Sequence, residues 1–518
     1  MPDSPTSARS GAPHVLDGGP LTVFDVQQVA RHGRIVELGR EGRARLEACN
    51  QLLTEAIAAG RTMYGINTGF GSFAHRRVSG DDLRNLQRNL IRSHAAGVGE
   101  LLPDDIVRGM ILMLAGSLSR GHSGVRPIVV ETLIGMLNGG VTPCVPRTGS
   151  VGASGDLAPL AHVAQVMIGE GTATLRTEPG TKLDGAEALR RAGVTPITLE
   201  AKEGLALING THLMASIAAL AVADCDRLMD AAVAAAAMSM DACRATDTFL
   251  DERVHILRNQ SGPARVAARL RNLLEGSQII PSHAVDDPRV QDPYSLRCAP
   301  PVIGAALDAL DYVRERVEAE LCAVTDNPLI FPAAEGERSV VSAGNFHGMP
   351  LAVPLDLLAI AMSHVAGIAE RRIYFILAAS DQENPLNPHL SPVPGLHSGL
   401  MITQYTAAAC CNEIATLCAP ASVINIPTCA GMEDYNSFGP RAGMKARRAV
   451  ELATRVVAIE LLVAGEAMEY QRPLRSGAGV ERAHAVLRTT VERLTADRSP
   501  APDIEAIARL IRTGRFGY

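Results

Sequence analysis

Aromatic side chains are scarce in this sequence. Its 518 residues include no tryptophan, and all aromatic residues together make up only 3%. Hydrophobic residues nevertheless amount to 47% and charged residues to 20%, a balance that favours a large buried core and excludes a disordered chain. A core with so few aromatic rings has to be built from small aliphatic side chains, as in closely packed helices.

The sequence also lacks the marks of several protein classes. A net charge of −6 provides no basic surface for nucleic acid. Ten cysteines without a CxxC pair predict reduced thiols and no metal site. The polar N-terminal stretch does not have the order of a signal peptide, and the longest apolar run, residues 231–240, is too short to cross a bilayer. We therefore expect a cytoplasmic protein without nucleic-acid, membrane or metal partners.

Hydrophobic periodicity predicts a mainly α fold with a loop-rich N-terminal half and a bundle of long helices behind it. The expected domains are a disordered tail (1–21), an N-terminal domain (22–215) and a helical bundle with C-terminal helices (216–518). Long apolar helices that one subunit cannot cover predict self-association. The best strand candidate is 171–183. The long helices are expected at 206–246, 301–323, 351–380, 398–418 and 444–470.

Two glycine-rich stretches invite enzymatic interpretations. Residues 69–74 read GFGSFA and formally match a dinucleotide-binding fingerprint, but no apolar strand precedes them. We expect a loop there, with Tyr64 at its start. Residues 149–156 read GSVGASGD, in which Asp156 replaces the second glycine of a GxSxG nucleophile elbow, so a serine hydrolase is disfavoured. Ser154 or Asp156 could instead cap the helix that follows.

A third interpretation involves the backbone of the tripeptide Ala153-Ser154-Gly155. Attack of the Gly155 nitrogen on the Ala153 carbonyl would close a five-membered ring. Loss of two waters, one of them from the Ser154 side chain, would leave an exocyclic methylidene, which is a strong carbon electrophile. Glycine suits the close backbone approach because it has no Cβ. Three residues alone do not decide between these alternatives.

Several longer motifs decide for the third interpretation by resemblance. Together with GSVGASGDLAPLAH, they resemble the ammonia-lyases and aminomutases that carry a methylidene-imidazolone (MIO) group, over about residues 22–515. Within this family the sequence is most similar to the histidine ammonia-lyases. The other motifs are YGINTGFG (64–71), RSHAAGVGE (92–100), KEGLALINGT (202–211), QDPYSLRC (291–298), TDNPL (325–329), GNFHG (344–348), PGLHSG (394–399) and PASV (420–423).

The resemblance implies an ammonia-lyase/fumarase-like helical fold, assembled as a homotetramer whose active sites draw on more than one chain. It implies an aromatic α-amino acid as substrate and ammonia plus a trans-2-enoate as products. The MIO group would form autocatalytically from Ala153, Ser154 and Gly155, without metal or nucleotide. Tyr64 matches the base that removes the β-hydrogen, and Arg297 matches the arginine that pairs with the substrate carboxylate.

Other residues match family positions around the electrophile and the substrate. Tyr294, Asn209 and Gln291 match positions near the MIO group and the substrate amine or carboxylate, and Phe346 matches an aromatic residue beside the electrophile. His94 matches the position that senses the substrate ring, and Glu433 matches the carboxylate that histidine ammonia-lyases place in the site. The remaining histidines of family motifs are interpreted as structural: His122, His162 and His347.

Glu433 favours L-histidine, converted to trans-urocanate, because a carboxylate accepts a hydrogen bond from an imidazole N–H. The surrounding sequence nevertheless departs from the histidine-specific pattern. Tyrosine or phenylalanine, a histidine analogue, a 2,3-aminomutase outcome and a non-catalytic assembly therefore stay open as alternatives. The departures from the pattern are Met432, Tyr435, Asn436, Met349 and His212.

Overall fold

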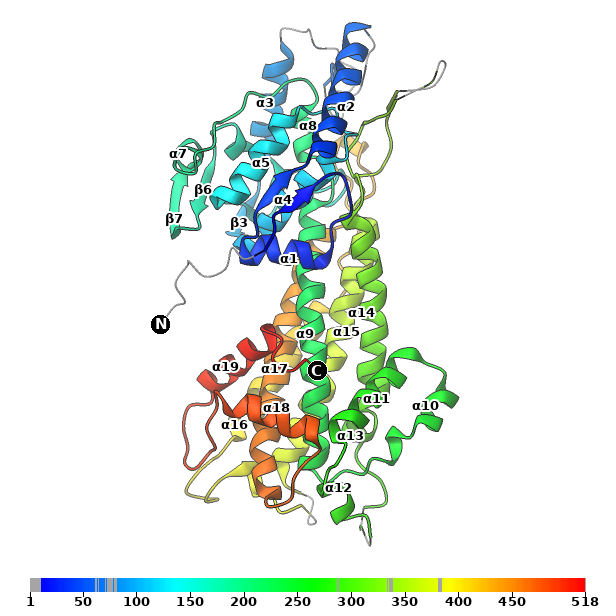
Figure 1. The fold of residues 1–518 in the computed structure, drawn as a ribbon, viewed down its shortest axis with the longest axis vertical. Helices are drawn as coiled ribbons and strands as arrows, with labels where there is room; N and C mark the ends of the chain where they lie inside the picture. The colour runs from blue at the N-terminus through cyan, green and yellow to red at the C-terminus, as the bar shows by residue number, and fades with distance from the viewer. Residues whose placement is uncertain are drawn as a thin grey trace. The chain divides into compact units, whose positions relative to one another are not determined.

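The computed structural model describes residues 11–60, 63, 65–69, 71, 78, 82–285, 287, 289–332, 334, 339–380 and 384–517. Most of them form α-helices, and the strands between the helices are short (Figure 1). The mainly α fold predicted from the hydrophobic periodicity is therefore confirmed.

The chain forms two compact units, each assembled from separate stretches of sequence. Unit 1 comprises Met1–Leu220, Arg314–Leu355 and Ala421–Met444, and unit 2 comprises Ala221–Val313, Asp356–Pro420 and Lys445–Tyr518. The domain boundaries expected at residues 21 and 215 stay a prediction. Four long helices have residues in both units: α9 (His212–Ala242), α14 (Ala299–Leu321), α15 (Met349–Ala378) and α17 (Gly439–Ala467).

Unit 1 contains shorter helices and all the strands found among the described residues. Its helices are α1 (Val23–His32), α2 (Arg40–Ala58), α3 (Leu83–His94), α4 (Asp104–Ser119), α5 (Pro127–Gly139), α6 (Ala158–Met167), α7 (Gly185–Arg191), α8 (Glu203–Ile208) and the 3-10 turn η5 (Cys429–Gly431). Its strands are β1 (His14–Leu16), β2 (Val36–Leu38), β3 (Val98–Leu101), β4 (Val141–Pro143), β5 (Pro146–Thr148), β6 (Thr172–Leu175), β7 (Glu178–Asp184), β8 (Leu329–Ile330) and β9 (Val340–Val341).

Part of the expected N-terminal tail is ordered. Strand β1 pairs in parallel with β2, and the side chain of Leu16 is only 4% exposed. His14 also lies 3.1 Å from the carboxylate of Asp25 in α1. These partners are distant in sequence, so the local composition of the tail does not reveal them. The strand candidate at 171–183 is confirmed as the antiparallel pair β6–β7, to which β4 adds a third strand.

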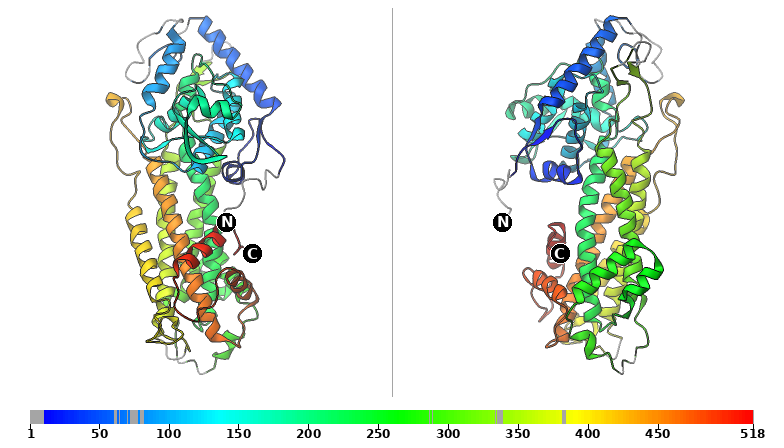
Figure 2. Two further views of the ribbon diagram at one scale, coloured as in Figure 1. Left: turned by 90° about the vertical axis from the view of Figure 1, so that its left-hand side faces the viewer. Right: turned by 45° about the vertical axis from the view of Figure 1, so that its right-hand side comes forward.

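Unit 2 is a helical bundle with a charged pair in its core. Arg372 in α15 and Glu460 in α17 are fully buried, with 2.5 Å between Nε and Oε1, and Ser239 in α9 donates a further hydrogen bond to Glu460. Figure 2 shows these three helices running side by side. The other elements of unit 2 are η3 (Thr248–Leu250), α10 (Glu252–Arg258), α11 (Ser261–Leu274), α12 (Ile279–Ser282), α13 (Tyr294–Arg297), η4 (Pro388–Leu390), α16 (Met401–Leu417), η6 (Met468–Gln471), α18 (Ala478–Arg488) and α19 (Ala501–Arg512).

Two of the long apolar helices, α9 and α15, are largely covered within one chain, whereas α16 exposes Ile402 and Tyr405. Residues 231–240 of α9 are all at most 1% exposed, so this stretch of the helix does not require a second subunit to bury it. The expected self-association therefore stays a prediction that α9 does not support. Among the described residues, α15 alone is long and apolar enough to cross a membrane, but 67% of its most apolar window is buried, as in a core helix.

Candidate active site

The tripeptide Ala153-Ser154-Gly155 lies in the loop between β5 and α6, against the junction of α8 and α9. Gly155 forms a parallel bridge with Gly210, and the backbone N–H of Asp156 donates to the Gly210 carbonyl at 2.8 Å. Gly155 has a φ of +74°, and a Cβ on it would lie 2.5 Å from the carbonyl carbon of Gly210. Only glycine therefore fits this position.

The preceding residues of the loop are held from a different part of unit 1. The carbonyl of Gly152 accepts hydrogen bonds from the Ser437 hydroxyl at 2.8 Å and from the Gly348 N–H at 3.2 Å. The carbonyl of Val151 accepts from the Phe438 N–H at 2.8 Å. The tripeptide is thus fixed at both ends by backbone contacts from three distant segments.

Asn209 is the side chain that contacts Ser154 directly. Its Nδ2 lies 3.3 Å from both the carbonyl oxygen and the hydroxyl oxygen of Ser154. The Oδ1 of Asn209 is buried and has no hydrogen-bond partner among the described residues. An unpaired buried acceptor of this kind is costly, so it marks a place where a donor is expected to bind.

A buried ion pair supports α8, the helix that leads to Asn209. Lys202, just before α8, lies 2.6 Å from the carboxylate of Asp326, and these side chains are 0% and 2% exposed. Removing one partner of such a pair would leave an uncompensated buried charge, which strongly destabilises the fold. The pair thereby anchors the start of α8 within unit 1.

The predicted helix cap at Ser154 or Asp156 is wrong. Helix α6 begins at Ala158 after Leu157, and no side chain caps it. The carboxylate of Asp156 instead accepts a hydrogen bond of 2.6 Å from the backbone N–H of Leu213, in the first turn of α9. Asp156 therefore caps a helix 57 residues further along the chain, which local spacing does not reveal.

Three buried titratable groups of unit 1 lie on or next to the segments that hold the tripeptide. Burial raises the pKa of Asp156 to about 8, against hydrogen bonds from the Leu213 and Met214 N–H groups. Burial also raises the pKa of Glu320, and it lowers the pKa of His212 to about 3. The uncharged forms of Asp156, Glu320 and His212 are therefore favoured in the folded protein.

We expect the melting temperature to fall as the pH rises from about 6.5 to about 8, and Asp156→Asn to remove most of this fall. The raised pKa of Asp156 means that the native state keeps a proton that the unfolded chain releases above about pH 4, so stability is lost as the pH rises through the folded pKa. His212 has the opposite sign but acts only below about pH 6.5.

The size of this effect is bounded, because one group contributes at most about 1.4 kcal/mol per pH unit. Differential scanning calorimetry of the wild type and Asp156→Asn at matched pH values measures it. Equal slopes for the two proteins would contradict a neutral Asp156 in the folded state.

His94 and Glu433 both belong to unit 1. Burial lowers the pKa of His94, while the Leu90 carbonyl and the charge of Glu433 act in the opposite direction. His94 Nδ1 lies 2.9 Å from the Leu90 carbonyl, which can only accept, so Nδ1 carries the hydrogen and Nε2 of the neutral ring is an acceptor. The hydroxyl of Thr428 donates to Oε2 of Glu433 at 2.9 Å.

Phe346 is half-buried in the segment before α15. The next residue, His347, hydrogen-bonds through Nε2 to the Tyr435 carbonyl at 3.0 Å, which connects this segment with the one that follows Glu433. His122 and His162 likewise bond to backbone groups, at 3.2 Å each. The histidines interpreted as structural thus all hold backbone segments.

Unit 2 brings together the other predicted residues. Arg297 donates to the Gln291 side chain at 2.7 Å and to the Asp292 carbonyl at 2.9 Å, and its guanidinium lies 4.6 Å from the ring centre of Tyr294. These contacts fix the plane of the guanidinium. A cavity of about 440 Å³ opens beside it, to which Arg289, Phe375 and Ser380 also contribute.

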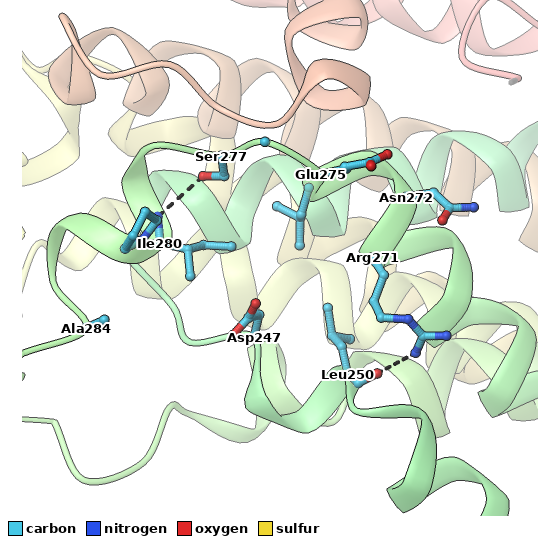
Figure 3. Close-up of a pocket in the computed structure, with 11 residues that line it drawn as sticks. Asp247, Leu250, Arg271, Asn272, Glu275, Ser277, Ile280 and Ala284 are labelled. Atoms are coloured by element: carbon cyan, nitrogen blue, oxygen red, sulfur yellow. Dashed lines mark hydrogen bonds between the residues drawn. The ribbon is translucent and has the colours of Figure 1, made fainter.

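A larger cavity in unit 2, of about 650 Å³, contains none of the predicted site residues. It lies between the end of α11 and the start of α12 (Figure 3). Arg271 donates to the Leu250 carbonyl at its edge, and the Ile280 N–H donates to the Ser277 hydroxyl. Over the described part of the chain, no group of three or more His, Cys, Asp or Glu side chains is arranged to hold a metal ion.

The residues that hold the predicted ones in place are not predicted from the sequence. Thr428, Ser437 and Gly210 act through hydrogen bonds or close backbone approach to residues that lie elsewhere in the sequence. Their only signal is membership of, or proximity to, a recognised motif. Tyr64, the predicted base, lies outside the described residues.

Comparisons with known proteins identify the family of this chain. The family model for aromatic amino acid lyases matches residues 21–489. Histidine ammonia-lyase of Symbiobacterium thermophilum is 46% identical over 506 residues, which is 96% of each chain. The crystal structure of histidine ammonia-lyase from Trypanosoma cruzi is 38% identical with a TM-score of 0.90, covering 98% of this chain and 94% of that one.

Tyrosine aminomutase from Streptomyces globisporus is similar as well, at 33% identity and a TM-score of 0.90 over 98% of both chains. The long motifs, the helical fold and these similarities over nearly the full length all lead to the same assignment. The chain belongs to the aromatic amino acid lyase family, the MIO-dependent ammonia-lyases and aminomutases, and is a carbon–nitrogen lyase.

Proposed function

We propose that the protein eliminates ammonia from L-histidine to give trans-urocanate. The observation that carries this proposal is the half-buried carboxylate of Glu433, whose Oε2 accepts a hydrogen bond from the Thr428 hydroxyl at 2.9 Å. Oε1 of Glu433 has no hydrogen-bond partner among the described residues, and Nε2 of neutral His94 is an acceptor, so the site can receive the N–H of an imidazole. Similarity to proteins named histidine ammonia-lyase supports the same substrate.

We propose Ala153, Ser154 and Gly155 as the source of the MIO group. Two observations support the fit: Gly155 lies where a Cβ would collide with Gly210, and Asn209 directs a donor to Ser154 while its own Oδ1 is unpaired. Once formed, the group supplies an electrophilic carbon that makes the substrate amine a better leaving group. The residues around it bind and orient the substrate.

Each of these residues has a separate task in the proposal. Arg297, whose plane is fixed by Gln291 and Tyr294, binds the substrate carboxylate and so orients the Cα–Cβ bond. Tyr64 removes the β-hydrogen as the base, which requires that its surroundings lower the pKa of its hydroxyl from the usual value of about 10. Asn209 accepts from the substrate amine through Oδ1, and Phe346 excludes water beside the electrophile.

Purified protein incubated with L-histidine should release ammonia and trans-urocanate in equal amounts. Chromatography of the products against authentic standards measures both, and a reaction without protein is the control. Ammonia without urocanate, or no change in L-histidine, would overturn the substrate assignment.

A 2,3-aminomutase is the second candidate, favoured by the similarity to tyrosine aminomutase. In it, the amine returns to the β-carbon, and the hydroxyl of a tyrosine substrate is also a donor for Glu433. Chiral chromatography for a β-amino acid distinguishes this outcome from free enoate. The exposed Met432 and Tyr435 next to Glu433 are the departures from the histidine-specific pattern that bear on this choice.

We also propose that the protein is a cytoplasmic homotetramer with shared active sites.

A further inference from the structure

Glu433 lies at the end of a tight turn whose other end is Thr428. The two residues form an antiparallel bridge, with the Thr428 N–H donating to the Glu433 carbonyl at 2.9 Å and the Glu433 N–H donating back at 3.3 Å. The Gly431 N–H closes the turn on the Thr428 carbonyl at 3.0 Å. Backbone hydrogen bonds alone thus fix the backbone of Glu433 relative to Thr428.

The turn has an unusual backbone conformation. Cys429, Ala430 and Gly431 have consecutive φ values of +50°, +54° and +87°, and two of these residues are not glycine. Left-handed backbone at non-glycine residues costs about 1–3 kcal/mol each and persists where the surroundings demand one precise arrangement. This arrangement brings the Thr428 hydroxyl to the side chain of Glu433.

The contact between these side chains leaves the two carboxylate oxygens of Glu433 in different states. The Thr428 hydroxyl donates to Oε2 at 2.9 Å, a charge-assisted hydrogen bond, and lies further, at 3.4 Å, from the Glu433 carbonyl. Oε1 has no partner among the described residues. Without the hydroxyl, the half-buried carboxylate could rotate about its last side-chain bond and present either oxygen or neither.

We propose that Thr428 is a positioning residue that holds Oε1 of Glu433 in the orientation in which it accepts from the substrate ring. The inference rests on the proposed function, because it assigns Glu433 to the recognition of that ring. It adds a specificity determinant outside the matched motif positions, in a turn where the sequence otherwise departs from the histidine-specific pattern.

Thr428→Val removes the hydroxyl while keeping the shape of the side chain. Valine suits the extended backbone of this position, with φ of −124° and ψ of 175°, and the bridge to Glu433 involves only backbone atoms. We expect the kcat/KM for L-histidine to fall about 10-fold, mainly through KM, as for loss of a hydrogen bond to a charged group. Thr428→Ser, which keeps the hydroxyl, should stay within about 3-fold of the wild type.

A double-mutant cycle tests whether Thr428 acts through Glu433. In a Glu433→Ala background, Thr428→Val should change kcat/KM by less than about 2-fold, because no carboxylate is left to orient. Intact-mass measurement should show the same two-water loss in every variant, which separates an effect on the substrate from one on formation of the electrophile. An undiminished effect in the Glu433→Ala background, or none in the wild type, would overturn the inference.

The outcome also separates this inference from the proposed function. If the wild type converts another aromatic amino acid but not L-histidine, the substrate assignment fails, and the same cycle on that substrate still decides the role of Thr428. If no aromatic amino acid is converted, both are overturned.

Discussion

Ser154→Ala should abolish the elimination, with kcat falling more than about 1,000-fold, on the scale of losing a group that acts on the substrate directly. Alanine has no hydroxyl to eliminate, so the methylidene carbon cannot form from this residue. The fold should survive, because Gly155 and Gly152 hold the loop through backbone groups and the Ser154 hydroxyl makes only the 3.3 Å contact with Asn209. Turnover of L-histidine and intact mass are the two measurements.

Ser150→Ala is a matched control for Ser154→Ala. Ser150 lies in the same loop, and its hydroxyl accepts only a long 3.3 Å hydrogen bond from Gly152. We expect Ser150→Ala to show the two-water mass loss of the wild type, whereas Ser154→Ala should have the full mass of its own sequence. A Ser154→Ala protein with the wild-type rate would refute the proposed electrophile.

Gly155→Ala should have the second large effect, through geometry and not through loss of a functional group. An alanine Cβ would lie 2.5 Å from the Gly210 carbonyl carbon and would also have to adopt a φ of +74°. Because the atoms that this Cβ would meet are backbone atoms of Gly210, which cannot rotate away, the tripeptide must move away from Gly210. We expect no two-water loss, no turnover, and a free energy of unfolding lowered by at least about 2 kcal/mol.

Gly193→Ala separates the two causes of this effect. Gly193 has a φ of +71°, but a Cβ there would meet no atom within 4 Å. It therefore imposes the same backbone strain without the close approach, and we expect normal mass loss and turnover with a loss of stability of about 1 kcal/mol. Gly155→Ala protein that matures normally would show that the bridge to Gly210 does not control the tripeptide.

Much of the fold follows from local patterns in the sequence. The long helices have strong apolar periodicity, and the predicted 351–380 and 444–470 correspond closely to α15 and α17. The strand candidate at 171–183, in which polar and apolar residues alternate, forms the hairpin β6–β7. The local pattern does not predict strand β1, because β1 is stabilised by β2, which lies about twenty residues away.

The site was predictable where a side chain has its own chemistry, and not where it acts through another residue. The family motifs in which they lie predict Ser154, Arg297 and Glu433 as site residues. Asp156 caps α9 and not the helix that follows it in sequence, because the tertiary fold brings the Leu213 N–H to its carboxylate. The role of Thr428 likewise depends on a turn whose left-handed backbone the sequence does not predict, because two of its three residues are not glycine.

A competition experiment tests the central claim most directly. Wild-type protein is incubated with equimolar L-histidine, L-tyrosine and L-phenylalanine in one vessel, and mass spectrometry follows the depletion of each and the appearance of each enoate. Relative depletion rates equal the ratios of kcat/KM. The account predicts that L-histidine is consumed first and that trans-urocanate is the main product. Preferential consumption of L-tyrosine or L-phenylalanine, with L-histidine unchanged, would contradict it.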